Sequence, residues 1–544
     1  MPALRELVVS RLKDAGVRMI FGVPGGGGNL DLIEAAGQAD LPFVLSATET
    51  GGALAALAQA EVTGRPGACL TTLGPGAASV ANGVACALLD RVPLLVFTDS
   101  HAAAAHGAFE HQQFDHRALF RPITKWSGRL SAECVDRTLD QAFASLLDPP
   151  PGPVHIDWPA DFETTPGRSS PESQAPSPEP RVPSPESRAP SPESRASSPD
   201  RFAALISRSR RPLFIVGLGA RQPADVTAIR GLLERHGAPA MVTYKAKGVV
   251  PDRHPCFAGV FTHALIEQAV VGTSDLIVGV GLDPVELLPR PWSYSQPAVY
   301  VGRWQVPCRH VPFAAQFVTD TPAGIREIDA LLQTPEWDLE IVCKKVNEQR
   351  RAIDISAEGM TAQDVVRVAA DQLAGAARVT VDAGAHMLPA TLLWPVDAPG
   401  QMLISNGLST MGFALPAAIG AALADRSRPV VALTGDGGLL MCAAELLTAV
   451  REKLRIIVIV FSDQSLSLIE IKQQRRQYHP AGVALGAVNW PALGESLGAA
   501  SFIAANEADL ARALETAREC QGPCLIEAKI DKSNYSRTLE VVRG

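Results

Sequence analysis

Short apolar runs alternate with helical patterns along most of this 544-residue chain. Met19–Val23, for example, has the length and composition of a buried strand, and residues 49–62 have the pattern of a helix. Such alternation implies a mostly parallel sheet with helices on both faces. The pattern resumes after residue 201 and again after residue 360. We therefore predict an α/β protein of three doubly wound parallel-sheet domains, at 1–165, 201–333 and 360–544.

The segment 166–200 has a different composition. From Ser170 to Arg201 a unit of the type SPESRAP repeats, with proline in every copy. Proline at this frequency prevents a continuous helix, and no unit has a large apolar face. We predict an extended low-complexity linker. The alternative is a proline motif that binds another protein.

Composition excludes several functional classes. The net charge is −8, which does not favour a nucleic-acid partner. No apolar run has the length of a membrane span, and residues 1–13 do not have the pattern of a signal peptide. The nine cysteines are dispersed without a CxxC pair, which suits a reducing compartment. We expect a cytoplasmic protein that binds neither nucleic acid nor membrane.

The strongest local signal lies in the third predicted domain. The apolar run Val430–Leu433 leads to Gly435-Asp436-Gly437-Gly438, and a second apolar run, Ile456–Phe461, leads to Ser462-Asp463. With the helical pattern at 443–450 this is a βαβ unit, so both aspartates follow parallel strands at the edge where ligands bind. A lone Gly-Asp-Gly is more often a plain turn, but the second acid reverses that preference. Glycines admit an anion and paired carboxylates suit Mg²⁺.

This unit resembles the cofactor motif of the thiamine-diphosphate-dependent enzymes, although that family usually has a pair of Asn where this chain has Ser462-Asp463. The resemblance implies that Asp436, Asp463 and the main-chain carbonyl of Ser465 hold Mg²⁺, which bridges to the cofactor's diphosphate. We expect the change from Asn to Asp to alter metal affinity more than to abolish binding.

Thr48-Glu49-Thr50 begins a predicted helix directly after a strand. A glutamate at a helix start often only complements the helix dipole. Here, however, Phe21–Gly26, Thr72–Gly76 and Ala81–Gly83 have the family's spacing. The resemblance implies that Glu49 hydrogen-bonds the aminopyrimidine ring of thiamine diphosphate and activates the cofactor. In the family the partner subunit provides the diphosphate site, so a homodimer or homotetramer with the active site at the interface is implied.

The resemblance extends over nearly the whole chain apart from the linker. In it, Met411 is the bulky residue that bends the cofactor, whereas alone it would be interpreted as a core methionine. The residues implied to contact thiamine diphosphate are Pro24, Gly25, Thr72, Gly74, Asn82, Gly384, Ala385, His386, Ser409, Met411, Gly435, Gly437, Gly438 and Leu466.

Within the family the chain most resembles the acetolactate synthases. Residues 111–115 and 121–125 resemble their substrate-side loop, in which Gln112 matches an active-site glutamine. His111 is a candidate proton donor at the reacting carbonyl. The alternative is that it is a polar loop residue, like His101, His106 and His116. The spacing of these histidines puts them on no common helical face, so we expect no zinc site from them.

Several positions differ from the flavin-binding synthases. Residues 259–264 lack their GxHG-like turn, which argues against FAD, and Gly217-Leu218-Gly219 alone is weak support for a nicotinamide. Gly27 and Gly28 replace larger residues, which predicts a roomier, less apolar wall beside the cofactor. The sequence therefore predicts a carboligase acting on 2-keto acids. The alternatives are a non-ligating 2-keto-acid decarboxylase or acyloin lyase, and an inactive paralogue that serves as a binding subunit.

Overall fold

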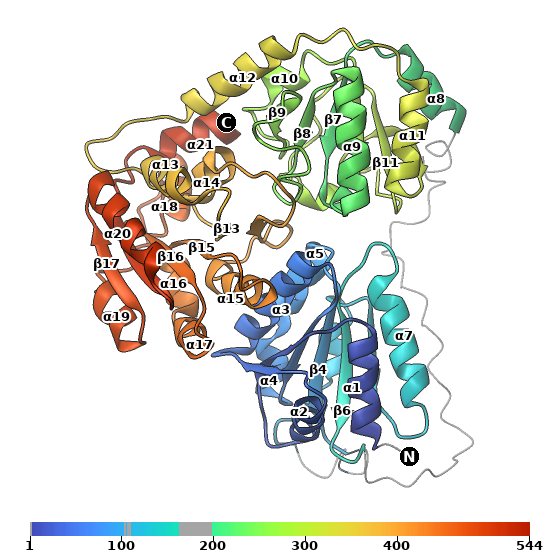
Figure 1. The fold of residues 1–544 in the computed structure, drawn as a ribbon, viewed down its shortest axis with the longest axis vertical. Helices are drawn as coiled ribbons and strands as arrows, with labels where there is room; N and C mark the ends of the chain where they lie inside the picture. Colours follow the sequence, from blue (N-terminus) through green and yellow to red (C-terminus); the bar gives the residue numbers. More distant parts are fainter. Residues whose placement is uncertain (1–2, 103–104, 106–109, 163–198) are drawn as a thin grey trace.

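The computed structural model describes residues 3–102, 105, 110–162 and 199–544. Three parallel sheets of six strands each, with flanking helices, form three lobes (Figure 1). This confirms the predicted α/β class. The domain boundaries predicted from the sequence stay a prediction, and the predicted linker lies outside the described residues except for its last two positions. No helix of the described chain is long and apolar enough to cross a membrane.

The first sheet has the strand order β2-β1-β3-β4-β6-β5. Its strands are β1 (Ile20–Val23), β2 (Phe43–Leu45), β3 (Gly67–Thr71), β4 (Leu94–Ser100), β5 (Trp126–Arg129) and β6 (Val154–Pro159). Its helices are α1 (Leu4–Asp14), α2 (Asn29–Gln38), α3 (Glu49–Thr63), α4 (Pro75–Ser79), α5 (Ala81–Leu89), α6 (His116–Phe120) and α7 (Val135–Leu147).

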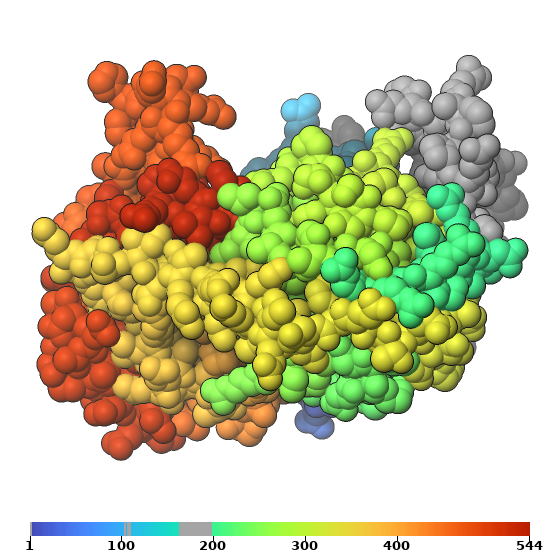
Figure 2. Space-filling model, turned by 90° about the horizontal axis from the view of Figure 1, so that it is seen from above, coloured from blue at the N-terminus to red at the C-terminus, as the bar shows by residue number. Residues whose placement is uncertain are grey.

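The second sheet has the order β12-β11-β10-β7-β8-β9. Its strands are β7 (Pro212–Val216), β8 (Ala240–Val242), β9 (Phe257–Val260), β10 (Leu276–Val280), β11 (Ala298–Gly302) and β12 (Phe313–Val318). Its helices are α8 (Pro199–Arg208), η3 (Leu218–Ala220), α9 (Pro223–His236), α10 (Gln268–Val271), η4 (Pro284–Glu286) and α11 (Thr321–Leu331). Helix α12 (Leu339–Ala352) follows, and Figure 2 shows this part of the chain, in yellow, crossing one face of the molecule.

The third sheet has the order β14-β13-β15-β16-β18-β17. Its strands are β13 (Arg378–Val381), β14 (Met402–Ile404), β15 (Val430–Gly435), β16 (Ile456–Ser462), β17 (Ala500–Ala504) and β18 (Cys524–Lys529). Its helices are α13 (Ala362–Leu373), α14 (Met387–Leu393), α15 (Ala414–Ala424), α16 (Asp436–Cys442), α17 (Glu445–Arg451), α18 (Ser467–Arg475), α19 (Trp490–Ser496), α20 (Glu507–Glu519) and α21 (Tyr535–Arg543).

The predicted strands are present, with bounds that shift by a few residues. The predicted βαβ unit is also present, because β15 and β16 pair in parallel with Gly435 opposite Phe461. The helix predicted at 443–450 is α17, with bounds shifted by one or two residues. A further short helix that was not predicted, α16, precedes it and begins at Asp436. Gly437 and Gly438 therefore lie in the first turn of α16.

The first and third lobes join through α3 and α15. Both helices are rich in alanine and glycine, and their facing residues are fully buried. A Cβ atom built on Gly420 would lie 1.9 Å from the carbonyl oxygen of Ala55, so only glycine allows this approach. The two backbones therefore pack against each other with almost no side chain between them.

A buried ion cluster joins all three lobes. The Lys245 ammonium, after β8, lies 2.7 Å from Glu61 of α3 and 3.1 Å from Asp90 at the end of α5. It also donates to the carbonyl oxygen of Ile404 in β14. Burial alone would lower the pKa of Lys245, but the attraction of the two carboxylates raises it, so the lysine is charged.

Removing this lysine leaves two buried carboxylates without their cation. We expect Lys245→Met to cost about 3–5 kcal/mol of stability, the range for breaking a buried ion pair on one side. The check is the thermal unfolding midpoint, which should fall clearly below that of the wild type. Lys344→Met, at an exposed position of α12, is the matched control and should leave the midpoint unchanged. Equal midpoints for both variants would contradict a stabilising role for the cluster.

Candidate active site

Asp436 lies at the carboxyl end of β15 and begins α16. Its Oδ1 accepts the backbone N–H of Gly437 at 2.8 Å, and its Oδ2 accepts those of Gln464 at 2.6 Å and Asp463 at 3.2 Å. The turn after β16 is thereby held against the start of α16. The pKa of Asp436 is raised by burial, because few charges around it compensate for lost solvation.

Asp463 stands beside Asp436, as the sequence predicts. Its carboxylate accepts the backbone N–H of Ser465 at 3.0 Å and the hydroxyl of Ser467 at 2.7 Å. Burial, with the nearby charge of Asp436, raises its pKa to about 6. Two neighbouring carboxyl groups, both with a raised pKa, form a site that positive charge would stabilise. The donor set is of carboxylate oxygens, which fits a hard divalent cation.

His386 lies next to these acids, in a position that fits an anionic ligand. Its ring stacks on Phe461 with centroids 4.9 Å apart, and a Cβ atom on Gly435 would lie 3.3 Å from its Cε1. The Nε2 atom is buried and has no hydrogen-bond partner in the described chain. A buried, unsatisfied ring nitrogen is costly unless a ligand completes it. Gly384 leaves room for the ring, since a Cβ there would be 2.6 Å from it.

Met411 and Leu466 come together over Gly437. A Cβ atom on Gly437 would lie 2.6 Å from Leu466 and 3.5 Å from the Met411 methyl group. Thus Met411, the residue predicted to bend the cofactor, lies against the turn at Gly435–Gly438, which is the predicted diphosphate loop. Ser409 precedes it in a left-handed conformation, with its hydroxyl donating to the carbonyl oxygen of Asn406. Gly438 lies in the first turn of α16, and Ala385 lies in the loop after β13.

The sequence interpretation missed Asp382 as an organising residue of these loops. This fully buried carboxylate accepts backbone N–H groups of Ala383, Gly412 and Phe413 and the hydroxyl of Thr434. It therefore joins the loop after β13 to the one that carries Met411. A Cβ atom on Gly438 would lie 2.5 Å from its Oδ2, so the glycine is needed for this contact.

In the first lobe, Glu49 is the first residue of α3. The side chain of Thr48 caps the helix by accepting the N–H of Gly51 at 2.9 Å. The carboxylate of Glu49 is half-buried and has no hydrogen-bond partner within the described chain. It lies against the loop after β3, because a Cβ on Gly76 would be 3.4 Å from its Oε1. In the part of the chain that the structure describes, no hydrogen bond or ion pair joins it to Asp436.

The same loop contacts other predicted residues. Thr72 packs on Gly25, which follows Pro24 after β1, and a Cβ on Gly25 would lie 2.2 Å from the Thr72 hydroxyl. On the opposite side the backbone of Gln112 packs on Gly74, where a Cβ would be 3.0 Å from the Gln112 carbonyl oxygen. Gln112 is exposed with a φ of 56°. The structure therefore brings Gln112 to the predicted cofactor loop.

His111 is less well supported as a functional residue. Its side chain is exposed, and its carbonyl oxygen lies 3.1 Å from Nε2 of His101. No described contact brings its ring toward Glu49 or Gly74. Asn82, by contrast, contacts the third lobe, since its Oδ1 accepts the hydroxyl of Thr410 at 2.9 Å, next to Met411.

Glu445, a second residue that the sequence interpretation missed, ties the two lobes together. Its buried carboxylate accepts the backbone N–H groups of Ala47 at 3.1 Å and Thr48 at 3.0 Å, and both hydroxyls of Thr48 and Thr448. The start of α3, with Glu49, is therefore fixed to α17, directly after the diphosphate loop. A local pattern could not reveal this contact, because the partners are far apart in the sequence.

The predicted roomier wall at Gly27 and Gly28 is wrong. A Cβ on Gly27 would lie 2.7 Å from Oδ2 of Asp99, and one on Gly28 would lie 2.4 Å from the indole of Trp158. Side chains from β4 and β6 thus fill the space that the glycines leave. Burial raises the pKa of Asp99 to about 7, and its Oδ2 has no partner in the described chain, so this wall is polar.

The carboxylates of Asp436 and Asp463 can hold a diphosphate through a divalent cation, and the carboxylate of Glu49 can face the ring of a cofactor. The comparison with known protein families agrees with such a cofactor site. Models described as thiamine pyrophosphate enzyme match the chain at residues 3–119 (N-terminal TPP binding domain), 200–298 (central domain) and 382–528 (C-terminal TPP binding domain). The chain belongs to the thiamine pyrophosphate enzymes and uses thiamine diphosphate.

Its relatives include acetolactate synthases. The catabolic acetolactate synthase of Raoultella terrigena is 28% identical over 97% of this chain and 94% of its own length, and the acetolactate synthase of Bacillus subtilis is 28% identical over 97% and 93%. A protein of Pseudomonas aeruginosa named probable 2-ketoarginine decarboxylase is also 28% identical, over 96% and 93%. Enzymes with different reactions are thus equally similar to this chain.

The unsatisfied nitrogen of His386 gives a direct test of the site. In His386→Phe the ring keeps its packing on Phe461 but cannot hydrogen-bond. Because a hydrogen bond to a charged group contributes about 1.5–3 kcal/mol, we expect thiamine diphosphate to bind roughly ten- to a hundredfold more weakly. Calorimetric titration of the protein with thiamine diphosphate and Mg²⁺ measures this. His479→Phe, at an exposed site, is the control. Unchanged affinity in His386→Phe would exclude the contact.

Proposed function

We propose that this enzyme is an acetolactate-synthase-like carboligase. A 2-keto acid loses CO2, and its former carbonyl carbon bonds to the carbonyl carbon of a second substrate. The observation that carries the proposal is the packing of Gln112 on Gly74, in the loop that also contacts Glu49. An amide beside the cofactor loop can orient a second carbonyl. The two acetolactate synthases that match 97% of the chain support it.

Bound thiamine diphosphate supplies the electron sink for decarboxylation and bond formation. The chain's own residues have separate tasks in this proposal. Asp436, Asp463 and the Ser465 carbonyl would hold Mg²⁺ beside a bound diphosphate, and Nε2 of His386 would contact that ligand. Glu49 holds a proton at the aminopyrimidine ring. Met411 and Leu466, which meet over Gly437, support the middle of the cofactor.

We infer that the chain self-associates, as a homodimer or homotetramer, and that the active site lies between two copies. Three exposed apolar side chains follow the diphosphate loop, Leu440, Met441 and Leu447, at 43%, 59% and 48% exposure. Such a group on α16 and α17 fits a surface covered by another chain. Glu49 ends in a carboxylate without a partner in the described chain, which fits a ligand held by the other subunit.

The residues of the central lobe do not fit FAD. In a dinucleotide site the glycine-rich turn after the first strand offers its backbone N–H groups to phosphate. Here the N–H of Leu218 donates to Glu286 at 2.9 Å, and the other oxygen of Glu286 accepts the Thr243 hydroxyl at 2.5 Å. A buried carboxyl group therefore occupies the position of a phosphate. We propose an enzyme without flavin, and a cytoplasmic location that suits its nine free cysteines.

The reaction is tested with pyruvate, thiamine diphosphate and Mg²⁺. We expect acetolactate as the product, its formation lost when a chelator removes the metal. Glu49→Gln should lower turnover by about 10²–10⁴-fold, the range for losing a positioned acid–base group. Release of only an aldehyde from pyruvate or from other 2-keto acids would favour the decarboxylase instead. Glu34→Gln, at an exposed position of α2, is the control and should keep full turnover.

Complementation between two inactive variants tests the shared active site. Glu49→Gln and Asp436→Asn should each be inactive alone, since each damages both sites of a dimer. When the two are co-expressed, a mixed dimer has one site with both residues intact. Roughly a quarter of all sites should then be active, if the chains pair at random in a twofold-symmetric dimer.

The outcome is decisive because a site within one chain predicts no recovery. In that case every site of the mixed dimer still carries one of the two changes. Purification through two different affinity tags isolates the mixed dimer, whose turnover should be about half that of the wild type by the same symmetry. Sedimentation velocity of each variant serves as the control that association is intact.

A further inference from the structure

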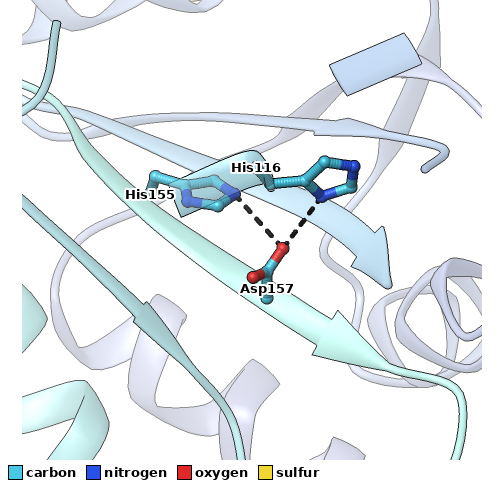
Figure 3. A group of neighbouring side chains, drawn as sticks. All are labelled: His116, His155 and Asp157. Atoms are coloured by element: carbon cyan, nitrogen blue, oxygen red, sulfur yellow. Dashed lines mark hydrogen bonds and ion pairs between the residues drawn. The ribbon is translucent and has the colours of Figure 1, made fainter. Parts of the chain in front are cut away.

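A buried polar cluster lies behind the cofactor loop of the first lobe and takes no part in the function proposed above. His116 of α6, together with His155 and Asp157 of β6, forms it (Figure 3). Nδ1 of His116 lies 3.1 Å from Oδ1 of Asp157, and Nε2 of His155 lies 3.6 Å from the same oxygen. Thr98 of β4 completes the group, since its hydroxyl donates to Asp157 at 2.9 Å.

The hydrogen bonds fix the position of each proton in this cluster. The backbone N–H of Gly74 donates to Nε2 of His116 at 3.3 Å, so that nitrogen carries a lone pair and Nδ1 carries the proton. Nδ1–H then points to Asp157. His155 lies 2.8 Å from Thr98 through Nε2 and 2.8 Å from the Ser127 hydroxyl through Nδ1.

The charges of His155 and Asp157 also follow from this arrangement. Burial lowers the pKa of His155 to about 4, so this ring is neutral. Burial alone would raise the pKa of Asp157, but its hydrogen bonds from His116 and Thr98 lower it, so the carboxylate is ionised. The cluster therefore has a carboxylate whose Oδ1 is held by hydrogen bonds from Thr98 and His116, and this network fixes the orientation of the His116 ring.

The ligand atoms of His116, His155 and Asp157 lie within 4.8 Å of one another, which is close enough for a metal ion. The bonds argue against that role. The Thr98 hydroxyl already lies 3.3 Å from His116, 2.8 Å from His155 and 2.9 Å from Asp157, where an ion would have to lie. Moreover, Nδ1 of His116 carries a proton as long as Nε2 accepts from Gly74.

Gly74 is where this cluster meets the proposed active site. It has a φ of 62°, and the backbone of Gln112 packs on its outer side. Two residues further on, Gly76 contacts Glu49. The loop thus stands between the acid proposed to activate the cofactor and the glutamine proposed to face the second substrate. Among the residues that the structure describes, the side chain that accepts the Gly74 N–H is His116.

We propose that His116 is a positioning residue that sets the loop at 72–76 through its unprotonated Nε2. Asp157 keeps the ring in the required tautomer, and Thr98 and His155 keep Asp157 in place, much as a buried acid orients the histidine of a catalytic triad. The loop then presents Gln112 and Glu49 at a fixed separation. The effect on turnover rests on the proposed function, whereas the effect on the loop does not.

Two amide substitutions separate the two bonds of His116. In His116→Gln the amide oxygen reaches about as far as Nε2 and can accept the Gly74 N–H. In His116→Asn the amide reaches only as far as Nδ1, so the bond to Asp157 is kept and the one to Gly74 is lost. A residue that only neutralises Asp157 would tolerate Asn better than Gln. The proposal requires the reverse order.

Hydrogen–deuterium exchange of the peptide that spans 72–76, followed in the protein without cofactor, gives the first readout. We expect His116→Asn to speed exchange of the Gly74 amide about tenfold, the loss of one net hydrogen bond, and His116→Gln to stay near the wild type. The second readout is kinetic, because kcat/KM with pyruvate should fall about tenfold or more in His116→Asn and recover in His116→Gln. Ser127→Ala, which removes a partner of His155 only, is the control and should leave the Gly74 amide unchanged.

Equal behaviour of the Asn and Gln variants, or greater damage from Gln, would overturn the proposal. So would one equivalent of tightly bound zinc or another transition metal per chain, measured by plasma emission spectroscopy and counted apart from the Mg²⁺ proposed at Asp436 and Asp463. If His116→Asn does not fold, His116→Phe replaces it, since its ring keeps the contact with Phe114. A wild-type enzyme inactive toward every 2-keto acid would refute the proposed function alone, because the exchange measurement still decides the role of His116.

Discussion

The contact between Glu445 and the start of α3 is the constraint on which the rest of the site depends. A single buried carboxylate accepts the N–H groups of Ala47 and Thr48, directly before Glu49. Because Glu445 begins α17, only two residues separate it from the end of α16, the helix that Asp436 begins. The acid of the first lobe and the diphosphate loop of the third therefore move as one unit. If the active site lies between two copies, this unit connects one cofactor position to the other within each chain.

Site residues could be predicted from the sequence where the signals that mark them are neighbours along the chain. Asp436 and Asp463 could be placed because apolar strands and glycines lie next to each of them, and strand pairing puts both at one sheet edge. Asp382 and the pair His116 and Asp157 could not be placed, because their partners lie on other strands and loops. The short edge strand β17 was missed for another reason, since its residues are half-exposed and lack strong alternation.

The glycines at 27 and 28 show the same limit from the opposite direction. Their small size predicted open space, but Asp99 and Trp158 occupy it. A glycine in a sequence indicates that a Cβ atom would not fit at that position. It does not indicate whether a ligand or another part of the chain occupies the space. Here a buried acid with an unsatisfied oxygen makes the wall less apolar, but together with Trp158 it also fills the space, so the wall is not roomier.

The packing of α3 on α15 limits how such an enzyme can open. Ala55 and Gly420 meet backbone to backbone, so at this point of the seam no side chain stands between the helices that could change rotamer and absorb a small rotation. Sliding by part of a turn would drive a carbonyl oxygen into the opposite helix. The first and third lobes are therefore locked at this seam, whereas the exposed turn that bears Gln112 lies outside it and is not subject to this constraint.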